Sequence, residues 1–172
     1  MTQQTPVQAM LAAAPTVPPP FRGAMLRRES DLPFVDLGDG SEMQVLQVDL
    51  AQGLWIVKMR FHPGCEIARH YHTGPVYAVT LSGRWHYQEY AEEINEPGSF
   101  LFEPAGSVHT LQTLPGSTEP AEVWFAVFGA NVNIDEVGDV ISIVDAATVL
   151  KTYQLLCADQ GKNADGVIVF GD

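Results

Sequence analysis

Short segments of alternating apolar and polar residues, separated by glycine and proline turns, run through residues 25–144. Residues 43–50 alternate in this way, and residues 54–62 place Lys58 and Arg60 between apolar neighbours. Alternation at every second position is typical of a strand with one buried face, and many such strands between Gly/Pro turns predict an all-β sandwich or barrel. Further strands are expected at 76–81, 85–90, 99–102, 108–114, 122–128 and 140–144.

The ends of the chain depart from this pattern, so we divide the chain into residues 1–24, 25–144 and 145–172. The first part is Pro-rich, and residues 1–20 contain no charged residue. This composition predicts either a disordered tail or an arm on a neighbouring subunit. The last part predicts one helix that begins after Asp145, stops near Gly161 and is followed by a short tail. One face of that helix is apolar: Val149, Leu150, Tyr153, Leu156 and Cys157.

Charge and cysteine content exclude several classes of function. The formal net charge of -12 at pH 7 would repel nucleic acid and anionic membranes, and no apolar run is long enough to span a bilayer. The two cysteines, Cys65 and Cys157, are far apart and have no metal-ligand spacing. This usage fits a reduced compartment, and we expect a cytoplasmic protein.

Three histidines carry the strongest chemical signal. His70 and His72 are one residue apart, so on a strand both imidazoles point to the same face. His109 is the third candidate ligand, from a later strand. Imidazole nitrogens are common ligands of transition metals, and we therefore predict a metal site formed by His70, His72 and His109. His62 and His86 lie outside this set and are expected to be ordinary surface or supporting residues.

The spacing around these histidines resembles the two motifs of the cupin superfamily. The first motif has Gly64 five residues before His70, and the second has Gly98, Pro104 and Gly106 ahead of His109. The resemblance implies a double-stranded β-helix, or jelly-roll, barrel for residues 25–144, with one C-terminal helix added. Many cupins are homodimers, and we expect one here, because exposed barrel edges and an apolar arm favour association.

Two positions depart from the usual cupin motifs. Val76 and Tyr77 occupy the places where a glutamate ligand could follow the paired histidines, and Thr113 stands where an asparagine is often found. Three neutral imidazoles without a carboxylate are therefore expected. This subset resembles 2,4'-dihydroxyacetophenone dioxygenase and, more distantly, acetylacetone dioxygenase. The resemblance implies a non-haem Fe(II) enzyme that uses O₂ to cleave a carbon–carbon bond next to a carbonyl group.

Ligand chemistry leaves alternatives open. Imidazole binds Fe(II), Zn and Ni alike, so Fe(II) is the expected metal and Zn or Ni are the alternatives. The expected partners are O₂ and a small carbonyl substrate, which can chelate the metal at the positions that three histidines leave open. A non-catalytic metal-binding or ligand-binding cupin remains an alternative. A cupin isomerase or hydrolase with another divalent metal is a further one, because a metal-bound water would fit the same ligands.

Two further residues are predicted near the reaction. In the dioxygenases that the chain resembles, a glutamate at the position of Glu103 lies near the metal, where it can orient a histidine or the substrate. The alternative is a solvated carboxylate beside the Pro104 turn. Tyr77 is expected to project toward the cavity, where the glutamate ligand is missing. Several aromatic strand residues are expected in the core by default, with the lining of the pocket as the alternative for some of them: Trp85, Tyr87, Phe100 and Phe102.

Overall fold

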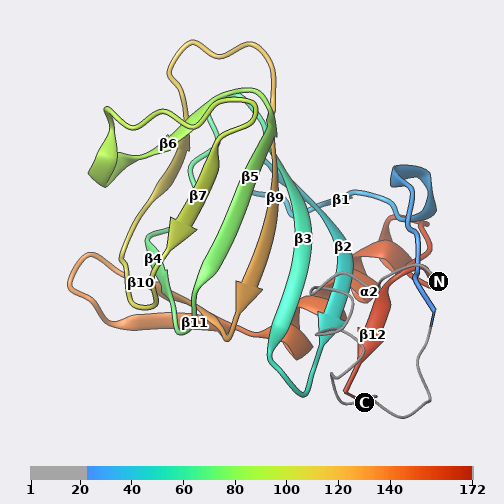
Figure 1. Cartoon of the computed structure of the whole chain (residues 1–172). Coiled ribbons are helices and arrows are strands. Elements are labelled where there is room, and N and C mark those ends of the chain that lie inside the picture. The colour runs from blue at the N-terminus through green and yellow to red at the C-terminus, as the bar shows by residue number, and fades with distance from the viewer. Residues whose placement is uncertain (1–22, 172) are drawn as a thin grey trace, which may run out of the picture.

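A computed structural model describes residues 23–171, which form a strand-rich barrel with one long helix (Figure 1). The largest sheet has seven strands, in which β12 (Ile168–Phe170) pairs in parallel with β2. The other six strands of this sheet follow the order β1 (Val35–Asp36), β2 (Ser41–Asp49), β3 (Leu54–Phe61), β9 (Ala121–Phe128), β5 (Val76–Ser82) and β7 (Phe100–Glu103).

Two smaller sheets lie across from the large one and complete the barrel (Figure 1). One has three strands, in the order β11 (Val140–Val144), β10 (Asn131–Ile134) and β4 (His70–His72). The other pairs β6 (Trp85–Tyr87) with β8 (Leu111–Thr113). Two short 3₁₀ turns are η1 (Glu29–Asp31) and η2 (Gln88–Tyr90). The predicted all-β jelly-roll barrel is confirmed.

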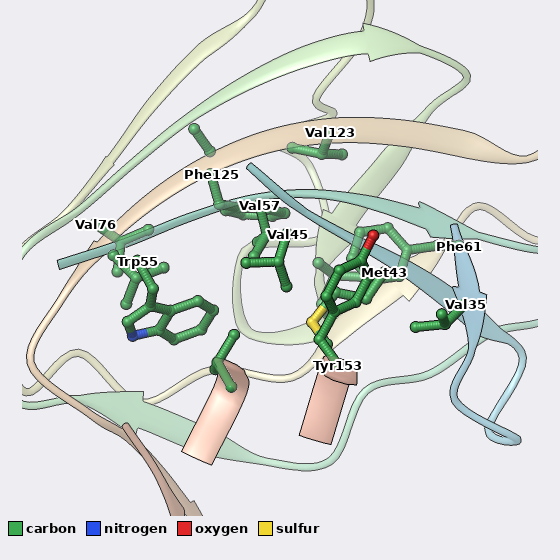
Figure 2. Packing of buried hydrophobic residues seen from close by; sticks show 14 of the residues in the cluster. Val35, Met43, Val45, Trp55, Val57, Phe61, Val76, Val123, Phe125 and Tyr153 are labelled. Carbon is green, nitrogen blue, oxygen red and sulfur yellow. The ribbon is translucent and has the colours of Figure 1, made fainter. Parts of the chain in front are cut away.

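The barrel interior is filled by the inward-facing residues of the central strands. On β3, Trp55, Val57 and Phe61 are buried, and the same side of β9 contributes Val123 and Phe125. Figure 2 shows these side chains packed together between the sheet and the helix. Complete burial of one such side chain stabilises the fold by roughly 1.5–3 kcal/mol, so this cluster is what holds the two sides of the barrel together.

The outer face of β3 anchors the segment that precedes β1. Lys58 and Arg60 point outward, and both form ion pairs with Glu122 of β9 and with Glu29 of η1. The Arg60 guanidinium also lies 3.6 Å from the ring centroid of Phe34. These contacts combine charge pairing with cation–π attraction, so they fix residues 29–34 against the outside of the sheet.

The helix α2 (Ala146–Asp159) follows β11 and packs against β1, β2 and β3. The Asp145 carboxylate accepts a 2.8 Å hydrogen bond from the backbone N–H of Thr148, which confirms the predicted N-cap. Val149, Tyr153 and Cys157 recur every four residues and are buried. The Tyr153 hydroxyl donates to the carbonyl oxygen of Pro33 at 2.6 Å, so the buried polar end of this ring is paired as well.

Three sequence expectations differ from the structure. Strand β10 was not expected, because Asn131 and Asn133 give it little apolar character. The segment expected as a strand at 85–90 turns into η2 after Tyr87, and β8 begins only at Leu111. Residues 1–22 of the predicted N-terminal arm lie outside the described residues.

None of the helices between residues 23 and 171 is long and apolar enough to cross a membrane.

Candidate metal centre

The structure brings the three predicted histidines together. His70 and His72 extend from β4, and His109 precedes β8. The backbones of His70 and His109 exchange two hydrogen bonds of 3.0 Å, which place the two motifs side by side. The candidate ligand atoms of the three rings all lie within 4.8 Å of one another, and the three residues are buried. This arrangement fits a single metal ion, and the role of the histidines as ligands stays a prediction.

The three imidazoles are held in their neutral form. Burial lowers the pKa of His70, and it lowers the pKa of both His72 and His109 to about 3, with the neighbouring imidazoles adding to the effect. The Nδ1 atom of His70 lies 2.7 Å from the carbonyl oxygen of Ala68. A neutral imidazole that donates from Nδ1 leaves the lone pair of Nε2 available, which is the form that binds a metal.

Unpaired buried atoms show that the site suits a cation. Within residues 23–171, Nδ1 of His72, Nε2 of His109 and Oε2 of Glu103 are buried and have no hydrogen-bond partner. Buried polar atoms are nearly always paired, and a cation would satisfy several of these at once. The unprotonated nitrogen of a neutral imidazole and a carboxylate oxygen are lone-pair donors of the kind that first-row transition metals accept.

Glu103 supplies a carboxyl group to this site. It ends β7 and is only 4% exposed, and its Oε2 atom lies 3.5 Å from Nε2 of His72 and 3.3 Å from Nε2 of His109. Burial raises the pKa of Glu103 to about 7, and a hydrogen bond from Tyr87 opposes that rise. Because the imidazoles are neutral, these contacts are not ion pairs. Of the two positions expected for Glu103, the structure places the residue beside the histidines and not in solvent at the Pro104 turn, and its role there stays a prediction.

Tyr87 lines the cavity, which was the alternative to a core position for this residue, but its contacts with the site were not predicted from the sequence. Its hydroxyl donates a 2.5 Å hydrogen bond to Oε1 of Glu103, and its ring stacks on His109 with centroids 4.1 Å apart. Burial and the carboxyl group of Glu103 raise the pKa of Tyr87 well above its usual value, so the hydroxyl stays a donor. Its position two residues after the inward-facing Trp85 was the signal that pointed to the interior.

Tyr77 does not reach the cavity, and its predicted place there is wrong. On β5 the buried residues are Val76 and Ala78, so Tyr77 points outward and is 38% exposed. Its ring lies 5.5 Å from that of Phe102 and 6.4 Å from that of Phe100. Phe100 and Phe102 are also exposed, which corrects their expected place in the core. These rings form an aromatic patch on the outside of the barrel.

The two remaining histidines lie apart from the site. His62 is exposed, as expected, with Nε2 at 3.7 Å from Glu42. Of the surface and supporting positions expected for it, His86 does not take the surface one: it is buried, and its Nδ1 lies 3.3 Å from the carbonyl oxygen of Ala91. Thr113, which replaces an asparagine of the usual motif, accepts a hydrogen bond from the backbone N–H of Gly64. It therefore fixes the loop that leads to the paired histidines.

A cavity of about 360 Å³ leads from His70 and His72 past β10 to α2. This volume is in the range of small-molecule sites, which are mostly apolar with a few polar groups. No lysine or arginine from residues 23–171 lines the cavity. Its apolar walls come mainly from strands β2, β3 and β9, and include Met43, Trp55, Val57, Met59, Phe61 and Phe125.

Solved structures of other proteins share this fold. A protein of unknown function with a cupin-like fold, from Ralstonia eutropha JMP134, is 29% identical, with a TM-score of 0.81 over 89% of this chain and 96% of that chain. An RmlC-like cupin from the same strain is 24% identical, with a TM-score of 0.73 over 79% of this chain and 88% of that chain. An acetylacetone dioxygenase from Acinetobacter johnsonii is 17% identical, with a TM-score of 0.68 over 82% of this chain and 97% of that chain.

Sequence comparison gives the family. No curated protein matches the chain significantly. A family model described as the ChrR cupin-like domain matches residues 22–130, which is more than half of the chain and includes all three candidate ligands. The matched range ends just before β10. The family match therefore covers both histidine motifs but not β10, which lines part of the cavity. The chain belongs to the ChrR cupin-like family.

Proposed function

We propose that this protein is a metal-dependent dioxygenase that cleaves a carbon–carbon bond next to a carbonyl group in a small hydroxyketone or diketone. The observation that carries the proposal is the convergence of three buried, neutral imidazoles, of which those of His70 and His72 line a cavity of about 360 Å³. Such a cavity holds a small ketone beside the ligands. The acetylacetone dioxygenase shares the fold, at an identity too low to support more than the fold.

His70, His72 and His109 would hold the metal. When bound, Fe(II) would supply open coordination positions for the substrate and O₂ and would mediate electron transfer between them, and the substrate provides the electrons that reduce O₂. One O₂ is consumed for each bond that breaks, and its two oxygen atoms end in the two carbonyl-containing products. The apolar walls of the cavity exclude water from the substrate, which limits competing hydrolysis.

Glu103 and Tyr87 would act on the proton of the substrate. Glu103 lines the cavity and its Oε2 atom has no hydrogen-bond partner, so the carboxylate could accept a proton from a hydroxyl group or from an acidic C–H group. The hydrogen bond from Tyr87 holds the other oxygen and thereby fixes the direction of the carboxyl group. Glu103 would thus accept the proton, and Tyr87 would only orient the Glu103 carboxyl group.

A non-catalytic metal-binding domain is the second candidate, and the position of Glu103 favours it. Its Oε2 atom is within 3.5 Å of two imidazole nitrogens, so the carboxylate could complete a set of four protein ligands. Closed sets of four ligands are typical of structural metal sites, whereas catalytic sites keep a position for water or substrate. An isomerase or hydrolase with another divalent metal would use the same three histidines.

The test combines metal analysis with oxygen consumption. Protein reconstituted with Fe(II) should bind about one iron per chain and consume O₂ with 2,4'-dihydroxyacetophenone or a β-diketone. His70→Ala should lose both properties, and His62→Ala, a change of an exposed histidine outside the site, should keep both. Bound iron without O₂ consumption would favour the non-catalytic domain. Conversion of substrate under anaerobic conditions would favour an isomerase or hydrolase.

A further inference from the structure

Two asparagines of β10 stand beside the candidate ligands. In the antiparallel pair of β10 with β4, Asn131 lies opposite His72 and Asn133 lies opposite His70. Residues that are directly opposite in such a pair point to the same face, with Cβ atoms about 4.5–5.5 Å apart. All four side chains line the cavity. The amide groups are therefore close enough to contact a ligand held at the histidines.

A chain of hydrogen bonds fixes the direction of both amides. Nδ2 of Asn131 donates to Oδ1 of Asn133 at 3.0 Å, and Nδ2 of Asn133 donates to Oγ of Ser142 on β11 at 2.8 Å. This leaves Oδ1 of Asn131 as an acceptor, and no group among residues 23–171 donates to it. An acceptor oriented in advance at a cavity wall selects a ligand that carries a donor.

The rest of the cavity restricts the charge of that ligand. The titratable acids in its lining are Asp39 and Glu103, and no lysine or arginine of the described chain faces it. A bound metal would pair with one anionic group at the histidines, but a carboxylate or phosphate elsewhere on the ligand would be taken out of water without a cationic side chain to pair with, which is costly. The cavity favours an uncharged ligand with an apolar body.

We propose that Asn131 positions the substrate by accepting a hydrogen bond from its hydroxyl group, so that the site takes uncharged α-hydroxyketones in preference to β-diketones. This inference rests on the proposed function and narrows its substrate class. An α-hydroxyketone carries a hydroxyl donor next to the carbonyl group. The diketo and enolate forms of a β-diketone carry no such donor, and the hydroxyl group of the enol form is already donated to the molecule's own second carbonyl group, so all three forms leave Oδ1 of Asn131 unpaired. Asn131 is thus a positioning residue and takes no part in the bond cleavage.

The test measures binding to the zinc-loaded protein, which consumes no O₂. Quenching of tryptophan fluorescence reports occupancy, because Trp55 lines the cavity. The two probes are 2-hydroxyacetophenone and 2-methoxyacetophenone, which differ by methylation of the donor oxygen. Asn131→Leu should weaken binding of the hydroxyl compound by about tenfold and leave the methyl ether within about twofold, since one hydrogen bond is removed. Asn163→Leu, the same substitution in the C-terminal tail, should change neither.

A second variant guards against misfolding. Asn131→Gln keeps both the amide acceptor and the amide donor that pairs with Asn133, so its preference for the hydroxyl compound should stay within about threefold of the native preference. Equal losses for both probes in Asn131→Leu, or no loss for either, would overturn the assignment of Asn131. The same holds if Asn131→Gln loses the preference. Because zinc is redox-inert, these results do not depend on whether the iron-loaded protein consumes O₂, which tests the proposed function separately.

Discussion

The Tyr87 hydroxyl donates its hydrogen bond to the Glu103 carboxyl oxygen that faces away from His72 and His109, while the Tyr87 ring stacks on His109. One residue of β6 therefore supports two groups of the site that come from different parts of the chain. Oε2 of Glu103 is left unpaired beside the two imidazoles. The electrostatics of the site depend on this contact, because it holds a buried carboxyl group without an adjacent cation.

Replacement of Tyr87 by Phe should destabilise the protein. The change leaves Oε1 of Glu103 buried without its donor, and an unsatisfied buried polar group costs roughly 1–3 kcal/mol. Urea denaturation measures the free energy of unfolding. Tyr77→Phe removes the same hydroxyl group from an exposed tyrosine and should change that free energy by less than about 0.5 kcal/mol. Equal stability of the two variants would show that the Tyr87–Glu103 hydrogen bond contributes nothing.

The metal-free protein should lose stability in acid. The pKa of His72 and of His109 is about 3 in the folded chain and about 6.5 in the unfolded chain. Below pH 6.5 the unfolded chain therefore binds protons that the folded chain does not, and the free energy of unfolding falls by at most about 1.4 kcal/mol per pH unit for each histidine.

The pKa of Glu103 changes the shape of this curve. It is raised to about 7, against 4.5 in the unfolded chain, so between these values the folded chain binds the extra proton. The free energy of unfolding then rises as the pH falls from 7 to 4.5, which offsets part of the histidine effect. The steepest loss is expected below pH 4.5. Urea denaturation of chelator-treated protein checks this, and His109→Gln should show a smaller slope there. Identical slopes would contradict the prediction.

The sequence alone predicted those parts of the site that depend on local spacing. The pairing of His70 and His72 follows from the two-residue period of a strand, and His109 was placed by its motif. Tyr77 was placed on the wrong face, because a shift of one residue in a strand reverses every side chain. Which residues of β7 and β6 face the histidines depends on strand pairing over long distances, so the Glu103–Tyr87 contact could not be derived from spacing.

The N-cap of α2 should contribute measurably to stability. The Asp145 carboxylate pairs with the backbone N–H of Thr148 and with its hydroxyl group, and these hydrogen bonds lower the pKa of Asp145. Asp145→Ala should reduce the free energy of unfolding by about 1 kcal/mol. Asp159→Ala, at the opposite end of the helix, removes a negative charge that the helix dipole disfavours and should be neutral or slightly stabilising. The reverse ranking in urea denaturation would refute this role of Asp145.

Metal binding should stabilise the folded protein against urea. A ligand that binds only the folded state raises the free energy of unfolding by about 2.7 kcal/mol at one hundred times its dissociation constant. Zn(II) at that excess should therefore raise the urea midpoint of the native protein, because the converged imidazoles exist only in the folded chain.

Matched histidine variants test the origin of this gain in stability. His62→Ala should show the full shift, since His62 is exposed and lies outside the cluster. His109→Gln should show less than half of it, because one of three ring nitrogens is lost. The variant is compared with and without metal, so any loss of stability from the substitution itself cancels. A full shift in His109→Gln would place the metal at other residues and remove His109 from the set of ligands.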